Sequence, residues 1–127
     1  MRRTLMQIYV KGSVEAVELY RKTFDAPIMA EYKNGDGTYA HCEIDIYGQI
    51  LAVSEFGPDV DSARTVGNNM QFCLHFERDE KDIVTKAYNI LIENAKKIYE
   101  PLGPCPFSPH MASFVDKFGT FWCIFTE

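Results

Sequence analysis

The stretch Ser113-Phe-Val-Asp-Lys-Phe-Gly-Thr-Phe-Trp-Cys-Ile-Phe125 lies near the end of the sequence and decides its fold. Residues 116–119, Asp-Lys-Phe-Gly, separate two apolar runs of the kind that form strands. An Asp side chain bonds to its own backbone in turns, and Gly accepts a positive φ. The stretch therefore predicts a β-hairpin with a tight turn at residues 116–119.

Outward from this hairpin, hydrophobic periodicity predicts the same order of elements twice, β-α-β-β-β. The first copy is predicted as a strand Leu5–Val10, a helix Val14–Phe24 with Ser13 as N-cap, and strands Ile28–Tyr32, Thr38–Tyr47 and Gln49–Phe56. The second is predicted as a strand Met70–Glu77, a helix Asp79–Asn94, a weak strand Lys97–Glu100, and strands Met111–Asp116 and Phe121–Thr126. We expect one α+β domain over residues 1–127, with modules 1–56 and 69–127 joined by a linker 57–68.

Residues 100–109 contain four prolines and one glycine, and we interpret them as a stiff irregular loop. Such a loop beside a sheet is a usual place for ligand contacts. Phe107 is its only aromatic residue, so it either contacts a ligand or anchors the loop to the core. The sequence favours neither reading.

The composition of the chain argues against several classes of binding partner. The 127 residues carry a net charge of −5, with no long cluster of Lys and Arg, which argues against nucleic acid or an anionic membrane as partner. No apolar run reaches the roughly 20 residues of a membrane span, and no signal peptide is evident. The four cysteines lack Cys-x-x-Cys spacing, so we expect reduced thiols and a cytoplasmic protein.

Three motifs carry a resemblance to a known family. Asp116-Lys-Phe-Gly followed by Trp122 resembles the Asp-x-Phe-Gly-x-x-Trp ending of PhnB-like proteins, a branch of the vicinal oxygen chelate (glyoxalase/bleomycin-resistance/extradiol-dioxygenase) superfamily. Residues 39–44 are similar to its His-x-Glu-Leu stretch, and residues 51–55 to its Leu-Met-Leu-Ser-Asp. The resemblance implies two βαβββ modules with curved mixed sheets, helices on their outer faces, a small organic ligand in the concave cavity, and a homodimer.

Alternation along the strands indicates which side chains line that cavity, because the uniformly apolar face of a strand should meet the helix. The polar sets are Gln7 and Tyr9; Tyr39, His41, Glu43 and Asp45; and Gln71, Cys73 and His75. The last strand is apolar on both sides, so only the resemblance places Cys123 inward. The ligand-binding candidates are Gln7, Tyr9, His41, Glu43, Ser54, Gln71, Cys73, His75, Phe107 and Cys123.

A catalytic divalent metal needs several converging N or O donors. The family's ligand positions correspond here to Leu5 or Gln7, Ala52 or Ser54, Gln71, and Cys123. Leu and Ala donate nothing, Gln is a weak donor, and one thiolate does not complete a hard-metal site. We therefore expect no cofactor, and a divalent metal is the disfavoured alternative.

Three functional hypotheses follow. The first is a metal-independent protein that binds or converts a small organic ligand. The second is a metal-dependent lyase, isomerase or dioxygenase with unusual ligands among His41, Glu43 and His75. The third, a methyltransferase as some members of this branch are named, is disfavoured because no glycine-rich nucleotide loop follows a strand. Each site candidate can also be explained without a ligand. The polar residues of a strand face can lie in solvent or at a dimer contact, and a core His can be held by hydrogen bonds. Aromatic and Cys residues can simply fill the core.

Overall fold

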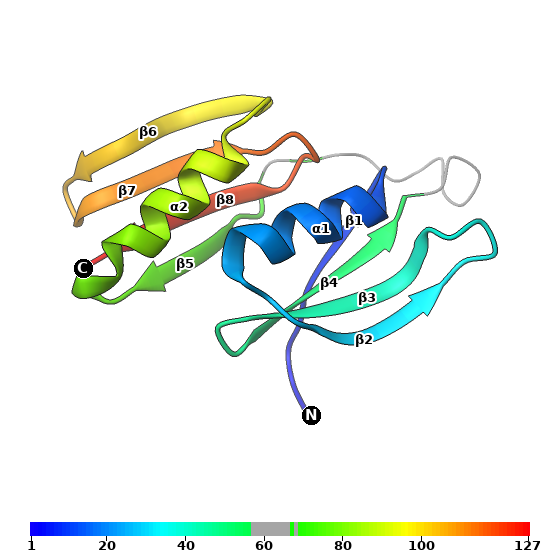
Figure 1. Ribbon diagram of the computed structural model, residues 1–127. Helices are drawn as coiled ribbons and strands as arrows, with labels where there is room; N and C mark the ends of the chain where they lie inside the picture. Colours follow the sequence, from blue (N-terminus) through cyan, green and yellow to red (C-terminus); the bar gives the residue numbers. More distant parts are fainter. Residues whose placement is uncertain (57–66, 68) are drawn as a thin grey trace. The chain divides into compact units, whose positions relative to one another are not determined.

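The computed structural model describes residues 1–56, 67 and 69–127, which form two compact units, Met1–Thr65 and Val66–Glu127 (Figure 1). Each unit has one helix against a four-stranded mixed sheet. This is the α+β architecture that the sequence predicts. The predicted linker 57–68 lies almost wholly outside the described residues, and the assignment of residues 1–127 to one domain stays a prediction.

The first unit contains a sheet in the order β1-β4-β3-β2, with β1 parallel to β4 and the other pairs antiparallel. Its elements are β1 (Met6–Val10), α1 (Ser13–Phe24), β2 (Ile28–Lys33), β3 (Tyr39–Ile46) and β4 (Gln49–Glu55). Helix α1 covers one face of this sheet, where Val17, Tyr20 and Phe24 are buried (Figure 1).

The start of α1 differs from the prediction, because the helix begins at Ser13 and its N-cap is Gly12. Gly12 has φ 85°, a left-handed conformation that suits glycine. The Glu55 carboxylate at the end of β4 accepts hydrogen bonds from the Gly12 and Ser13 amides and from Ser13 Oγ, at 2.9–3.0 Å. A distant carboxylate thus satisfies two of the backbone amides that have no partner within the helix at its start.

The second unit repeats the arrangement, with the sheet order β5-β8-β7-β6 and β5 parallel to β8. Its elements are β5 (Phe72–Phe76), the 3-10 turn η1 (Arg78–Glu80), α2 (Lys81–Leu91), β6 (Lys97–Cys105), β7 (Ser108–Val115) and β8 (Phe121–Thr126). The predicted bounds of β8 are confirmed, whereas β5 and α2 are shorter than predicted.

The β7–β8 hairpin has the predicted turn at residues 116–119. Asp116 is fully buried, and its Oδ1 accepts hydrogen bonds from the amides of Phe118 and Thr120 at 2.9 and 3.0 Å. Its Oδ2 accepts the indole Nε1–H of Trp122 at 2.9 Å. Gly119 has φ +90°. One carboxylate therefore fixes both the turn and the largest buried side chain of the unit.

The irregular loop predicted at residues 100–109 is wrong, because most of it belongs to β6 and β7. Strand β6 pairs only with β7 and so lies at the edge of its sheet. An edge strand tolerates Pro, since one side of it needs no ladder donor. The register of β6 against β7 shifts three times, and Pro101 and Pro104 fall within those shifts. The stiff loop expected here is in fact part of the β6–β7 hairpin.

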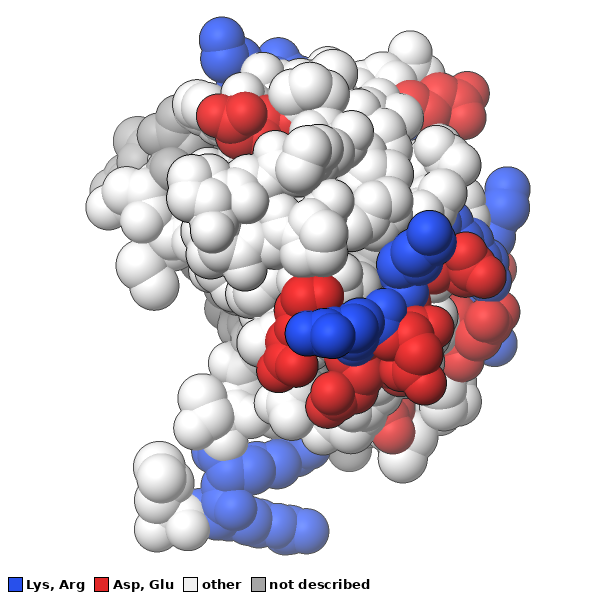
Figure 2. Space-filling view, turned by 90° about the vertical axis from the view of Figure 1, so that its left-hand side faces the viewer, with Lys and Arg blue, Asp and Glu red and all other residues white. Residues whose placement is uncertain are grey.

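The charges on the face drawn in Figure 2 are mostly mixed, with basic side chains beside acidic ones and one smaller group that is basic only. The ion pairs of the first unit include Arg21–Glu18 at 3.3 Å and Lys33–Glu31 at 3.5 Å. Among the helices that the structure describes, none has the length and apolarity needed to span a bilayer.

We expect Gly119→Val to lower the free energy of unfolding, because a β-branched residue at φ +90° is strained by about 1–3 kcal/mol. Gly35→Val is the matched control, since a Cβ added at Gly35 would meet open space and its φ is not positive. Urea denaturation compares the two variants. Equal stability of Gly119→Val and Gly35→Val would mean that the turn does not need glycine.

Candidate functional site

The polar residues of the first unit gather on the side of the sheet that α1 does not cover, here called the far face of the first sheet. Strand register places Gln7 and Glu43 on either side of Ala52, and Tyr9 beside Ser54. Their neighbours along the strands, such as Leu51 and Val53, are fully buried on the α1 side. The structure therefore places Gln7, Tyr9, His41, Glu43 and Ser54 on one face.

Tyr39, which alternation assigns to the same face, lies on the α1 side instead. A register shift between Tyr32 and Lys33 pairs Lys33 with Tyr39 and leaves Ala40 as an extra residue in β3. Such a β-bulge reverses the alternation beyond it. Tyr39 is accordingly buried, and its pKa is raised by burial and then by the nearby Cys42 and Glu31.

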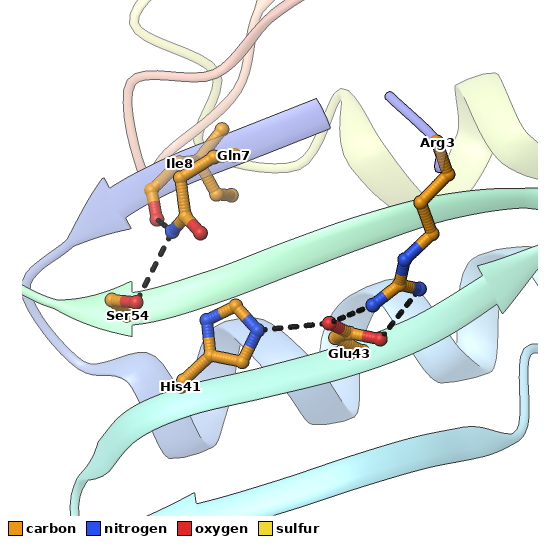
Figure 3. A network of polar contacts seen from close by, with 6 residues as sticks. All are labelled: Arg3, Gln7, Ile8, His41, Glu43 and Ser54. Atoms are coloured by element: carbon orange, nitrogen blue, oxygen red, sulfur yellow. Dashed lines mark hydrogen bonds and ion pairs between the residues drawn. The ribbon is translucent and has the colours of Figure 1, made fainter. Parts of the chain in front are cut away.

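Glu43 is the centre of the polar network on the far face (Figure 3). It is only 6% exposed, and Arg3 binds it with two parallel contacts, Nη1 to Oε2 at 3.0 Å and Nη2 to Oε1 at 2.9 Å. His41 Nε2 lies 3.0 Å from Oε1. Paired N–H donors in this fork geometry form the strongest type of carboxylate contact.

These contacts hold the pKa of Glu43 below its usual range, chiefly through the Arg3 hydrogen bonds and then through His41. The contribution of ionised Glu43 to stability is therefore present above pH ~4.3, the usual pKa of Glu in an unfolded chain. It is lost as the pH falls through the lower value of the folded state. At neutral pH the far face contains a fixed carboxylate.

The charge of Glu43 determines how His41 is arranged. An ionised carboxylate only accepts hydrogen bonds, so Nε2 of His41 must be the donor. Nδ1 has no partner among the described residues and can accept a hydrogen bond when the ring is neutral. The side chain is one-third exposed. A carboxylate that fixes the tautomer of an imidazole is the arrangement that general bases use.

A second contact on the far face joins β1 to β4, where Gln7 Nε2 donates to Ser54 Oγ at 3.1 Å and to the Ile8 carbonyl at 2.9 Å (Figure 3). Two tyrosines supply aromatic surface. Tyr9 is 48% exposed, and the Tyr32 ring lies 6.4 Å from that of His41. The face thus combines hydrogen-bonding groups with accessible rings.

The other site candidates lie in the second unit, on the side of its sheet away from α2. Register pairs Cys73 with Cys123 and His75 with Phe125. Gln71 Nε2 donates to Ser113 Oγ at 2.9 Å, and the His75 ring stacks on Phe125 at 4.5 Å. Phe107 is 62% exposed at the tip of the β6–β7 hairpin, where its ring meets Phe125 edge to face at 5.3 Å. A single cavity shared by both units stays a prediction.

Arg3 is the functional candidate that sequence reasoning missed. It precedes β1 and lies 40 positions from Glu43, and no local pattern links the two. A buried acidic residue on a predicted strand is the one available indication, since buried carboxylates need a partner. The guanidinium side chain is 47% exposed, so it can also face a ligand.

The far face does not fit a divalent metal. Both oxygens of Glu43 already bind the Arg3 guanidinium, a cation that occupies the side where a metal would lie. Within residues 1–56, 67 and 69–127, no group of three or more His, Cys, Asp or Glu side chains is placed to hold a metal ion. His75 lies in the second unit, so its combination with His41 and Glu43 stays a prediction.

Comparison with solved structures identifies the fold. A PhnB protein of Bacillus cereus, described as a candidate 3-demethylubiquinone-9 3-methyltransferase, is similar over 99% of this chain and 100% of its own, with 21% identity and a TM-score of 0.82. A Pseudomonas aeruginosa protein matches over 100% and 98%, with 19% identity and a TM-score of 0.76. The fosfomycin resistance protein FosX of Listeria monocytogenes matches over 97% and 91%, with 13% identity and a TM-score of 0.67.

No family model matches the chain, and neither does any curated protein. At these identities the structural likeness establishes the fold and leaves the activity open. The chain has the vicinal oxygen chelate fold, as the Asp116–Trp122 motif predicts.

We expect the Glu43 carboxyl to titrate below the usual Glu pKa of about 4.3 in the native protein, and nearer to it in Arg3→Gln. Carbon-detected NMR of the side-chain carboxyl measures both values. Arg2→Gln is the matched control, because it removes the same charge from the adjacent position, and Arg2 has no paired carboxylate in the described part of the chain. Identical titration of Glu43 in all three proteins would show that Arg3 does not hold it.

Proposed function

We propose that the protein binds a small polar organic molecule on the far face of the first sheet, without a metal. The observation that carries this proposal is the Arg3–Glu43–His41 network. A carboxylate that is 6% exposed and held ionised by two partners is costly to bury. Perturbed carboxylates of this kind concentrate at functional sites.

The geometry indicates which chemical groups the ligand carries. His41 Nδ1 accepts a hydrogen bond when the ring is neutral, and three N–H groups of Arg3 are not used by Glu43. Exposed rings of Tyr9 and Tyr32 provide apolar surface nearby. A compound with a ring, a hydrogen-bond donor and an acceptor matches this set. If the ligand is also converted, the Glu43–His41 pair supplies the proton-accepting group at Nδ1.

A metal-dependent activity is the second candidate. One FosX structure from Listeria monocytogenes contains Mn(II) and dihydroxypropylphosphonic acid, at 12% identity and a TM-score of 0.63. For this chain the alternative requires Arg3 to leave Glu43, because the guanidinium covers both carboxylate oxygens. The homodimer and the participation of Gln71, Cys73, His75, Phe107 and Cys123 in the same site also stay predictions.

We expect hits from a library of phenols, aromatic amides and aromatic carboxylates to raise the melting temperature of the native protein. Affinity for those hits, measured by calorimetry, should fall about tenfold or more in His41→Ala, which removes the Nδ1 acceptor, and in Glu43→Gln, which no longer fixes the His41 tautomer. A ligand donor left without its acceptor costs about 1–3 kcal/mol. Arg3→Gln should weaken binding in the same direction.

His110→Ala is the matched control, because His110 lies in the second unit and contacts Thr85 of α2 at 2.7 Å. It should leave affinity unchanged. Hits that bind equally well to native protein and His41→Ala would contradict the proposal. Elemental analysis distinguishes the second candidate: one divalent metal per chain that is lost in His41→Ala would establish metal-dependent function instead.

A further inference from the structure

Two cysteines stand side by side on the face of the second sheet away from α2. Cys73 on β5 and Cys123 on β8 are register partners in the parallel pair of strands, so their side chains leave the sheet at the same level and on the same side. Both are free thiols; Cys73 is exposed and Cys123 is 7% exposed. Cys73 is therefore accessible to a reagent in solution, and Cys123 lies next to it.

The neighbours of Cys73 hold its side chain in place. Cys73 Sγ lies 3.6 Å from Gln71 Oε1. The amide of Gln71 is itself oriented by its donation to Ser113 Oγ at 2.9 Å and to the Trp122 carbonyl at 3.3 Å.

The spacing of paired strands favours a bridged pair over a direct disulfide. Neighbouring strands lie about 4.8 Å apart, and side chains that leave register partners in parallel keep roughly that separation. A disulfide needs Cβ atoms about 3.8 Å apart, so it would pull β5 toward β8. A zinc–thiolate bond is about 2.3 Å long, so a metal ion of similar size between two thiolates holds their sulfurs about 4.6 Å apart, close to the spacing of the strands.

The donor set contains two thiols and no more. No third His, Cys, Asp or Glu completes a metal-binding group with them in the part of the chain that the structure describes. His75, the next residue on the same face of β5, is stacked on Phe125 at 4.5 Å, and its Nε2 lies 3.9 Å from Glu127. Structural zinc takes four ligands, whereas thiolates also select Cu(I), a soft ion that is satisfied by two.

We propose that Cys73 and Cys123 form a two-thiolate site for a soft monovalent cation of the Cu(I) type. Each thiol releases one proton to solvent as its S–Cu bond forms, so Cu(I) and two thiols give a bis-thiolate complex and two protons, with no change of oxidation state. The site lies wholly in the second unit and does not depend on the function proposed for the first.

The test is an anaerobic titration of the reduced full-length protein with Cu(I), with bicinchoninate as the competing chelator. We expect one Cu(I) per chain, held at least about tenfold more weakly by Cys73→Ser and by Cys123→Ser. Cys105→Ser and Cys42→Ala are the controls and should bind as the native protein does. X-ray absorption of the loaded protein should show two sulfur ligands.

Circular dichroism and melting temperature show whether each variant folds. Cys73 is exposed, so Cys73→Ser should keep the native fold. The Cu(I) affinity of Cys73→Ser therefore tests the proposal even if Cys123→Ser does not fold. Native protein that takes up no Cu(I), or Cys73→Ser that retains native affinity, overturns the proposal. A third sulfur ligand that disappears in Cys105→Ser also overturns the two-thiolate site.

Discussion

The second unit depends on one buried carboxylate, that of Asp116. It accepts hydrogen bonds from two turn amides and from the Trp122 indole, all at 2.9–3.0 Å. Removal of this side chain would break three hydrogen bonds to a charged group, each worth about 1.5–3 kcal/mol. The interaction fixes the register of β7 against β8, and β8 in turn sets the level of Cys73 beside Cys123. A motif that decides the fold thereby also positions a proposed site.

Much of the fold could be predicted because its determinants are local. The turn at residues 116–119 and the apolar face of each strand follow from residue types a few positions apart. The failures arise where a neighbouring strand overrides the local pattern. Ala40 forms a bulge only in its pairing with β2, which turns Tyr39 toward α1. Pro101 and Pro104 predict a loop when the sequence is considered alone. The structure places them in β6, an edge strand, where missing amide donors are tolerated.

The candidate site likewise contains residues that the sequence predicts and residues that it does not. Alternation along β3 was enough to put His41 and Glu43 on one face, and the structure shows them 3.0 Å apart. Arg3 could not be predicted, because its contact with Glu43 spans 40 positions and begins outside any regular element. Glu55 has an equally non-local role at the start of α1. Long-range ion pairs of this kind decide whether a polar strand face is a binding site, and they leave no periodic trace in a sequence.

The proposed ligand site lies on the far face of the first sheet rather than on the face beneath α1. Methyl NMR tests it within one strand, because Ala52 faces the Glu43 side, whereas Leu51 and Val53 face α1. Titration with a binding phenol or aromatic amide should shift the Ala52 methyl signal and leave those of Leu51 and Val53 nearly unchanged. Shifts confined to Leu51 and Val53, with Ala52 unmoved, would contradict the account.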